Sequence, residues 1–127
     1  MISSWFVADI LIDRKDARAT HSIAAIGSSS VDKGKKFAQD FCPKESPKIY
    51  GSYEEVYSDP NVDCVYIGTP HSFHKKNCLD AINAGKNVLC EKPFTMNARE
   101  AEEVIKAAKE KGVFLMEGML NLRFSAL

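Results

Sequence analysis

The stretch VDCVYIGTPHSFHKKNCLDAINAGKNVLC, residues 62–90, contains two apolar runs that are separated by a helical pattern. Residues 62–70 are almost continuously apolar, which is typical of strands buried on both faces of a parallel sheet. Residues 72–85 are predicted to form a helix, with Gly85 in the position that follows its last turn. Because residues 86–90 form a second short apolar run, the stretch predicts a parallel βαβ unit.

The alternation of helices and strands continues on the N-terminal side of this stretch. Apolar residues recur at helical spacing in the first segment, where Trp5 and Phe6 are expected to face the core. Gly34 weakens the second helical pattern, since glycine is a poor helix former. The elements predicted on this side are helices over 2–14, 31–41 and 52–59, and strands over 21–26 and 48–51.

On the C-terminal side, one further helix has clear start and stop signals. Asn97 is a suitable N-cap, and Glu100 follows it at the spacing of a capping box. Gly112 is expected to end the helix, and residues 113–117 read as a last strand. The whole pattern predicts an α/β fold in which a parallel sheet is flanked by helices.

Composition excludes several classes of protein. The chain has 127 residues, of which 45% are hydrophobic, and its 17 basic residues balance 17 acidic ones. We therefore expect one domain with a real core and no nucleic-acid partner. No apolar run reaches the length of a membrane span, and the N-terminus lacks the features of a signal peptide, so we expect a cytoplasmic protein with no membrane partner. The four cysteines form no CxxC pair, and we expect no disulfide framework.

Unusual polar residues follow three of the predicted strands. These segments are SSS at 28–30, TPHSFH at 69–74 and EKP at 91–93. In a parallel α/β sheet the ligand crevice lies at the carboxyl ends of the strands, so all three segments are expected to face it. Together they predict a site for a ligand that carries phosphates and a reactive ring.

The side chains of the EKP segment indicate what this site can do. Lys92 can donate hydrogen bonds to ligand hydroxyls or stabilise charge on a carbonyl oxygen, and Glu91 can orient it. Pro93 fixes the backbone, and a cis Lys92–Pro93 bond would turn the chain sharply. The Lys92 ammonium is therefore the candidate catalytic group.

Other candidate cofactor-binding residues surround this centre. The hydroxyl and imidazole groups that follow the neighbouring strand can bond a polar ring substituent. Three serines with a nearby lysine suit a ribose 2′-phosphate better than a free 2′-hydroxyl, while the alternative is an ordinary Gly-Ser turn. Glu117 either bonds the ribose or lies at the edge of the core. The complete set of cofactor-binding candidates is Ser28, Ser29, Ser30, Lys33, Thr69, Pro70, His71, His74, Glu91, Lys92, Pro93 and Glu117.

A metal site is the weaker alternative for part of this set. His71, His74 and Cys78 share one face of the predicted helix, but the sequence offers no evident fourth ligand. We therefore expect no metal.

Residues 20–117 resemble the N-terminal domain of the Gfo/Idh/MocA family of NAD(P)-dependent oxidoreductases. The resemblance is carried by YEEVYSDPNVDCVYIGTPHSFH (53–74), AINAGKNVLCEKPFTMNAREAEEV (81–104) and FLMEGM (114–119). Within the family, the dihydrodiol and D-xylose dehydrogenases are the most similar branch. The resemblance implies a Rossmann domain that binds NADP, with NAD as the alternative, and transfers hydride to or from a sugar or diol. It also implies that Lys92 lies beside the nicotinamide and that Thr69, Pro70, His71 and His74 line the cofactor.

The chain departs from the family pattern at both ends. The opening strand and G-x-G-x-x-G/A turn of the family are absent, so residues 1–119 are expected to be an incomplete Rossmann domain that lacks its first, central strand. Residues 120–127 are expected to be a truncated tail leading to an absent substrate domain, which supplies the acid/base and the dimer contact in this family. We therefore expect the chain to be inactive alone. The alternative is a non-catalytic remnant that serves as a weak nucleotide-binding or protein-interaction module.

Overall fold

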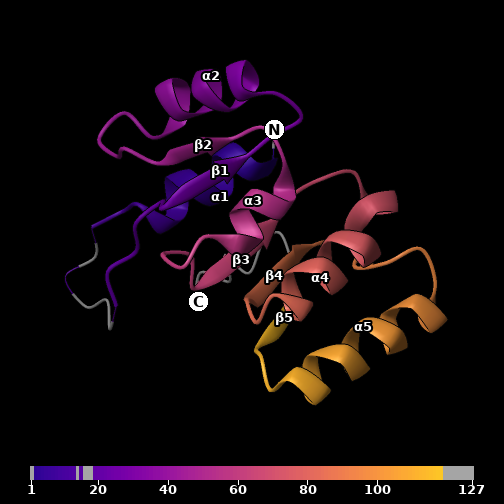
Figure 1. Ribbon diagram of the computed structural model, residues 1–127. Coiled ribbons are helices and arrows are strands. Elements are labelled where there is room, and N and C mark those ends of the chain that lie inside the picture. The colour runs from indigo at the N-terminus through magenta and orange to yellow at the C-terminus, as the bar shows by residue number, and fades with distance from the viewer. Residues whose placement is uncertain (1, 14, 16–18, 119–127) are drawn as a thin grey trace, which may run out of the picture. The chain divides into compact units, whose positions relative to one another are not determined.

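The computed structural model describes residues 2–13, 15 and 19–118 (Figure 1). It divides into two compact units, Met1–Val62 and Asp63–Leu127, and each is described by itself below. The tail predicted at residues 120–127 lies outside the described residues.

The first unit contains a two-stranded parallel sheet and three helices. Strand β1 (Ala25–Gly27) pairs with β2 (Lys48–Tyr50), with Ala25 opposite Lys48. The helices are α1 (Ile2–Ile10), α2 (Val31–Phe41) and α3 (Tyr53–Ser58). Helix α2 connects the two strands, as the parallel pairing requires.

Two expectations for the first helix are wrong. Helix α1 ends at Ile10 instead of residue 14, and the side chain of Trp5 is 66% exposed instead of facing the core. Val7 and Ser4 of α1, which are three residues apart and therefore share one face, are buried. Trp5 therefore lies outside the buried face, whereas Phe6 is partly buried.

Gly34 has a packing reason inside α2. A Cβ atom added at this position would lie 2.6 Å from Cγ2 of Ile49 in β2. Because side-chain carbon atoms cannot approach so closely, the absence of a side chain allows α2 to lie close to the sheet. The helix therefore tolerates the poor helix propensity of glycine in exchange for this close contact.

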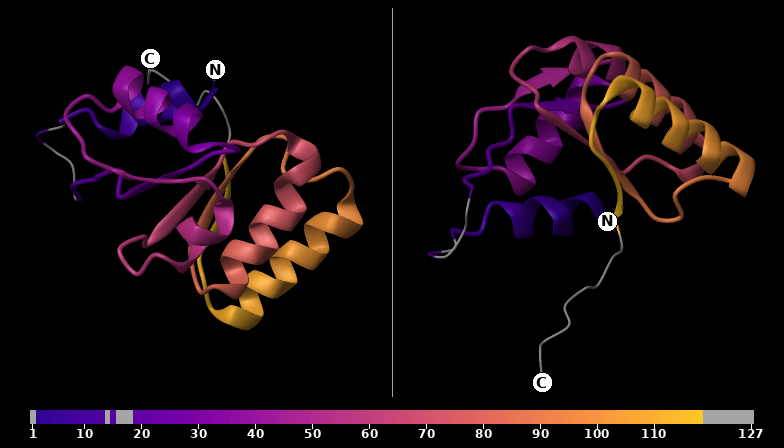
Figure 2. Two further views of the ribbon diagram at one scale, coloured as in Figure 1. Left: turned by 45° about the horizontal axis from the view of Figure 1, so that its top comes forward. Right: turned by 90° about the horizontal axis from the view of Figure 1, so that it is seen from below.

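The second unit contains a three-stranded parallel sheet with strand order β3–β4–β5. Strand β4 (Asn87–Glu91) is central and pairs with β3 (Cys64–Ile67) and β5 (Leu115–Gly118). A short 3₁₀ helix, η1 (His71–Phe73), leads into α4 (His74–Asn83), and α5 (Ala98–Lys111) connects β4 with β5. Figures 1 and 2 show α4 and α5 side by side on one face of this sheet.

The core of the second unit lies between this sheet and its two helices. Its fully buried members come from both α4 and β4, and include Cys78, Ile82, Val88 and Cys90. Val104 of α5 is also fully buried. The parallel α/β architecture predicted from residues 62–90 is therefore confirmed. The first, central strand of a complete Rossmann sheet is not among the strands that the structure describes.

The predicted ends of α5 are also confirmed. The side chain of Asn97 accepts a hydrogen bond from the backbone N–H of Glu100 at 3.0 Å. At the other end Gly112 adopts φ 68°, the left-handed conformation that closes many helices. Among the helices of the described ranges, none has the length and apolar character that crossing a membrane requires.

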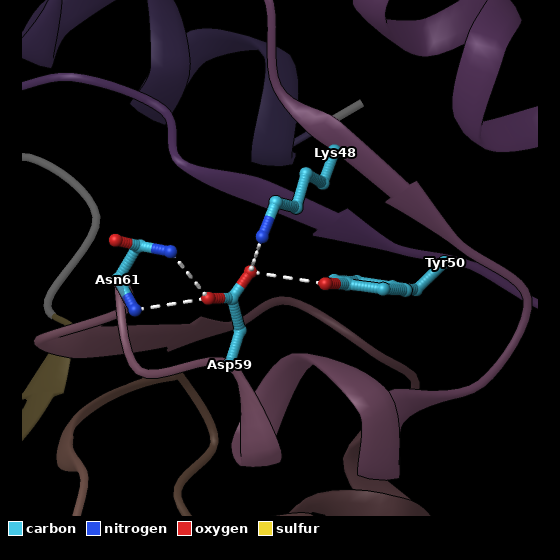
Figure 3. A network of polar contacts seen from close by, with 4 residues as sticks. All are labelled: Lys48, Tyr50, Asp59 and Asn61. Atoms are coloured by element: carbon cyan, nitrogen blue, oxygen red, sulfur yellow. Dashed lines mark hydrogen bonds and ion pairs between the residues drawn. The ribbon is translucent and has the colours of Figure 1, made fainter.

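A network around Asp59 joins the parts of the first unit (Figure 3). Its Oδ2 accepts a hydrogen bond from the Tyr50 hydroxyl at 3.0 Å and lies 3.3 Å from Nζ of Lys48. Its Oδ1 accepts hydrogen bonds from the backbone and side-chain nitrogens of Asn61 at 2.9 and 3.0 Å. The backbone N–H of Asn61 is the largest cause that lowers the pKa of Asp59 from 3.8 to about 2. Because Asp59 is 3% exposed, the network is an internal connection between β2 and the end of α3.

Candidate functional site

The EKP segment begins at the carboxyl end of the central strand of the second unit. Glu91 is the last residue of β4 and is 6% exposed. One carboxylate oxygen accepts a hydrogen bond from the Tyr66 hydroxyl at 2.8 Å, and the other accepts one from the backbone N–H of Lys92 at 3.2 Å. A buried carboxylate needs such partners to offset its lost hydration. Glu91 therefore holds the backbone of Lys92 rather than its ammonium group.

Lys92 lies where the chain leaves the sheet. Its side chain is exposed, and the Lys92–Pro93 peptide bond is cis. The backbone N–H of Phe94 donates a hydrogen bond to Oε1 of Glu117 in β5 at 3.0 Å. Carboxylates from two neighbouring strands thus hold the backbone on either side of the Lys92–Pro93 pair.

The TPHSFH segment follows the adjacent strand β3. The Thr69 hydroxyl oxygen accepts a hydrogen bond from Nδ2 of Asn77 at 3.0 Å, which leaves the hydroxyl proton of Thr69 available to a ligand acceptor. The side chains of Pro70 and His71 are exposed. His74 is 1% exposed, and its ring contacts the carbonyl oxygens of Thr69 and Pro93. The structure thus brings the TPHSFH and EKP segments together through a buried histidine.

The remaining candidates lie in the first unit, at the start of α2. Ser30 is the N-cap of this helix and accepts a hydrogen bond from the backbone N–H of Lys33 at 3.4 Å. The Lys33 ammonium donates to the Ser29 hydroxyl at 3.1 Å. The backbone N–H of Ser28 donates to the carbonyl oxygen of Tyr50 at 3.2 Å. Hydroxyls, an ammonium group and a helix N-terminus are the donors that a phosphate requires, so these residues fit a nucleotide phosphate.

The cysteines near the EKP segment lie in the core of the second unit. Cys78 and Cys90 are free and fully buried. The hydrogen bond with Cys78, followed by burial, raises the pKa of the Cys90 thiol far above its ordinary value, which keeps it protonated. Among the described residues, no group of three or more His, Cys, Asp or Glu side chains is arranged to hold a metal ion.

Two residues that support the site were missed in the sequence. Tyr66 bonds Glu91, and Asn77 bonds Thr69. Asn77 is three residues after His74 on α4, so a polar pair on the otherwise apolar face of that helix was the available signal. Tyr66 gave no signal, because its partner is 25 residues away in the chain and strand pairing alone brings the two together.

The comparisons with known proteins agree with this geometry. The model of an oxidoreductase family with an NAD-binding Rossmann fold, Gfo/Idh/MocA, matches residues 5–119. The chain is 44% identical over 127 residues to D-xylose 1-dehydrogenase (NADP(+)) of Hypocrea jecorina, covering 97% of this chain and 32% of that protein. It is 43% identical over 110 residues to trans-1,2-dihydrobenzene-1,2-diol dehydrogenase of Sus scrofa, covering 87% of this chain and 32% of that protein.

Solved structures of oxidoreductases are also similar to this chain. An NAD-binding oxidoreductase from Klebsiella pneumoniae matches 92% of this chain and 29% of its own, with a TM-score of 0.76 and 29% identity. A 3-ketoreductase from Actinomadura kijaniata, solved with NADP and TDP-benzene, matches 88% of this chain and 34% of its own, with a TM-score of 0.72 and 32% identity. The chain thus spans about a third of the length of the curated relatives it matches.

Proposed function

Because the chain belongs to the Gfo/Idh/MocA oxidoreductase family, with its NAD-binding Rossmann fold, we propose that it binds NADP(H) and serves hydride transfer. The substrate class is a sugar or diol that carries a CH–OH group. Two relatives with 44% and 43% identity are named for such substrates, and the first is named for NADP(+). These relatives are about three times as long as this chain, so complete activity requires the further sequence that they possess.

The observation that carries the proposal is the exposed Lys92 on a backbone that two carboxylates hold by hydrogen bonds. Glu91 and Glu117 fix the neighbouring peptide groups on both sides of Lys92–Pro93. The bound nicotinamide would supply or accept the hydride. The ammonium group of Lys92 would donate a hydrogen bond to the reacting oxygen of the substrate and stabilise the negative charge that develops there. The Thr69 hydroxyl would donate its remaining proton to a polar group of the bound ligand.

The preference for NADP over NAD is assigned to the start of α2. Lys33 and Ser29 already contact each other at 3.1 Å, and a 2′-phosphate accepts hydrogen bonds from both groups. No acidic side chain stands among residues 28–30, where a carboxylate would favour the free ribose hydroxyl of NAD.

A fluorescence titration of the chain with NADPH tests the proposal. We expect saturable binding that Lys33→Ala weakens roughly 10-fold or more, the size of one charge-assisted hydrogen bond. NADH binding should be nearly unchanged by the same substitution. Lys36→Ala is the matched control, because Lys36 lies on the same helix and pairs with Asp40 at 3.3 Å. A chain that gives no saturable signal contradicts the proposal and favours a non-catalytic protein-interaction module.

A further inference from the structure

The segments that follow the two strands of the first unit lie side by side. The backbone N–H of Ser28, directly after β1, donates a hydrogen bond to the carbonyl oxygen of Tyr50, the last residue of β2, at 3.2 Å. A Cβ atom added at Gly51 would lie 3.4 Å from Cγ2 of Val31, the first residue of α2. The chain that follows β2 therefore lies against the segment that carries the three serines and the start of α2.

Gly27 brings Tyr53 close to the end of β1. A Cβ atom added at Gly27 would lie 3.1 Å from Cδ1 of Tyr53 and 2.8 Å from Cγ2 of Val56, both in α3. The second distance is shorter than carbon atoms tolerate, so the absence of a side chain at Gly27 allows α3 to lie this close to β1. The ring of Tyr53 consequently lies beside the backbone one residue before Ser28, at the same edge as the candidate phosphate-binding residues.

The hydroxyl of Tyr53 is not used by the part of the chain that the structure describes. It has no hydrogen-bond partner there, whereas the hydroxyl of Tyr50, three residues earlier, donates to Asp59 at 3.0 Å. Among the described residues, no buried side-chain nitrogen or oxygen lacks a partner, and Tyr53 is half-buried, so its hydroxyl oxygen reaches solvent. A tyrosine hydroxyl both donates and accepts hydrogen bonds, and this one is available to a ligand at the edge of the sheet.

The proposed 2′-phosphate offers more acceptor sites than the residues of α2 supply with donors. Lys33 and Ser29 contact each other at 3.1 Å and provide an ammonium and a hydroxyl group. The hydroxyl of Ser30 accepts from the backbone N–H of Lys33 as the N-cap of the helix. A phosphate group has several strongly accepting oxygens, and hydrogen bonds to such charged oxygens are among the strongest in proteins. An unused hydroxyl on the adjacent segment suits an oxygen that Lys33 and Ser29 do not reach.

We propose that Tyr53 is a specificity-determining residue of the NADP site, whose hydroxyl donates a hydrogen bond to the 2′-phosphate of the cofactor. This assignment rests on the proposed function. The free ribose hydroxyl of NADH is uncharged, and a neutral hydrogen bond contributes less net free energy than one to a charged group. The role of Tyr53 should therefore appear as a difference between NADPH and NADH.

Tyr53→Phe tests the assignment without removing a contact within the protein. Because the hydroxyl has no partner in the described part of the chain, the Tm of the ligand-free chain should stay unchanged. NADPH should bind roughly 10-fold more weakly, as expected for one lost hydrogen bond to a charged group, and NADH binding should be nearly unchanged. Adenosine 2′,5′-bisphosphate, which has the 2′-phosphate but no nicotinamide, should lose as much affinity as NADPH. Calorimetric titration measures all three ligands.

Tyr50→Phe is the matched control in the same unit. Its hydroxyl donates to the buried Asp59 at 3.0 Å, so this variant should have a lower Tm (Figure 3). Measured well below that temperature, it should bind NADPH as the unmodified chain does. The two variants thus separate a contact with the ligand from a contribution to stability, since each is expected to change the quantity that the other leaves unchanged.

Three results for the variants overturn the assignment of Tyr53. The first is a Tyr53→Phe chain that binds NADPH as tightly as the unmodified chain. The second is an equal loss of affinity for NADPH and NADH, which would place the hydroxyl away from the 2′-phosphate. The third is an equal loss in Tyr50→Phe, which would make the effect one of stability. An unmodified chain that binds neither NADPH nor adenosine 2′,5′-bisphosphate overturns the proposed function itself, and the assignment of Tyr53 with it.

Discussion

The three-stranded sheet of the second unit and the two-stranded sheet of the first unit differ in the number of strand partners and in the burial of their strand residues. Strand β4 has a partner on each side and two helices against one face of its sheet, and its Val88 and Cys90 are fully buried. Strands β1 and β2 have three residues each, and all six are intermediate or exposed. Two-stranded sheets are marginal by themselves. In the first unit, the Asp59 network adds polar contacts that connect β2 with the end of α3.

This difference has a consequence for function. The candidate catalytic lysine and His74 lie in the unit with the three-stranded sheet, whereas Ser29 and Lys33 lie in the unit with the two-stranded sheet. Loss of packing in the first unit should therefore affect phosphate binding before it affects the geometry around Lys92.

The largest expected effect comes from the core of the second unit. Ile82→Ala removes a fully buried side chain and should destabilise the chain by about 2–5 kcal/mol, through lost burial and the cavity left behind. Ile105→Ala is the matched control, because Ile105 is 41% exposed on α5 and should cost much less. Urea unfolding measures both. Equal costs would show that the second unit is not packed as described.

A smaller effect is expected at the edge of the candidate site. Tyr66→Phe removes the hydroxyl that donates to Oε1 of Glu91 and should cost about 1.5–3 kcal/mol, the range for a hydrogen bond to a charged group. Tyr53→Phe is the control, since its hydroxyl has no hydrogen-bond partner in the described part of the chain. Thermal unfolding of the two variants measures the loss of stability in each. If Tyr66→Phe is as stable as the control, Glu91 does not depend on this contact.

The smallest expected effect is a loss of stability at acid pH, and it should affect the first unit before the second. The pKa of Asp59 is lowered from 3.8 to about 2 in the folded chain, so its contribution is complete above about pH 4 and is lost as the pH falls toward 2. The stability gap between the unmodified chain and Asp59→Asn should close over this range. Hydrogen exchange read by unit should show the first unit opening before the second. A gap that stays constant down to pH 2 would contradict the role of the network.

Local features of the fold could be predicted from the sequence because they depend on neighbouring residues. The apolar runs at 62–70 and 86–90 indicated buried parallel strands, and Asn97 and Gly112 marked the ends of α5 by capping chemistry alone. The sequence raised the cis form of the Lys92–Pro93 bond only as a condition, and the structure has this form. The buried face of α1 was not predicted correctly. Periodicity places Trp5 and Val7 on different faces of the helix, but it does not show which face the rest of the unit covers.

The candidate site was predictable in its location but not in its contacts. The ends of β3 and β4 follow from the order of the elements. The contact of His74 with Pro93 spans 19 residues and that of Tyr66 with Glu91 spans 25, and only the register of the sheet brings them together. For the same reason, the sequence assigned the His74 side chain to the cofactor, a role that stays a prediction, whereas the structure places its two nitrogens on protein carbonyls.

The most direct test of the central claim is a residue-resolved NMR titration of the chain with NADPH. The account predicts saturable shifts of the backbone amides of residues 28–33 in the first unit, and of Thr69, His71, Lys92 and Phe94 in the second unit. The groove of the first unit lined by Ala38, Cys42 and Ile49 should not respond. Shifts confined to that groove, or no saturable shift at the ends of β3 and β4, would contradict the assignment of the cofactor site.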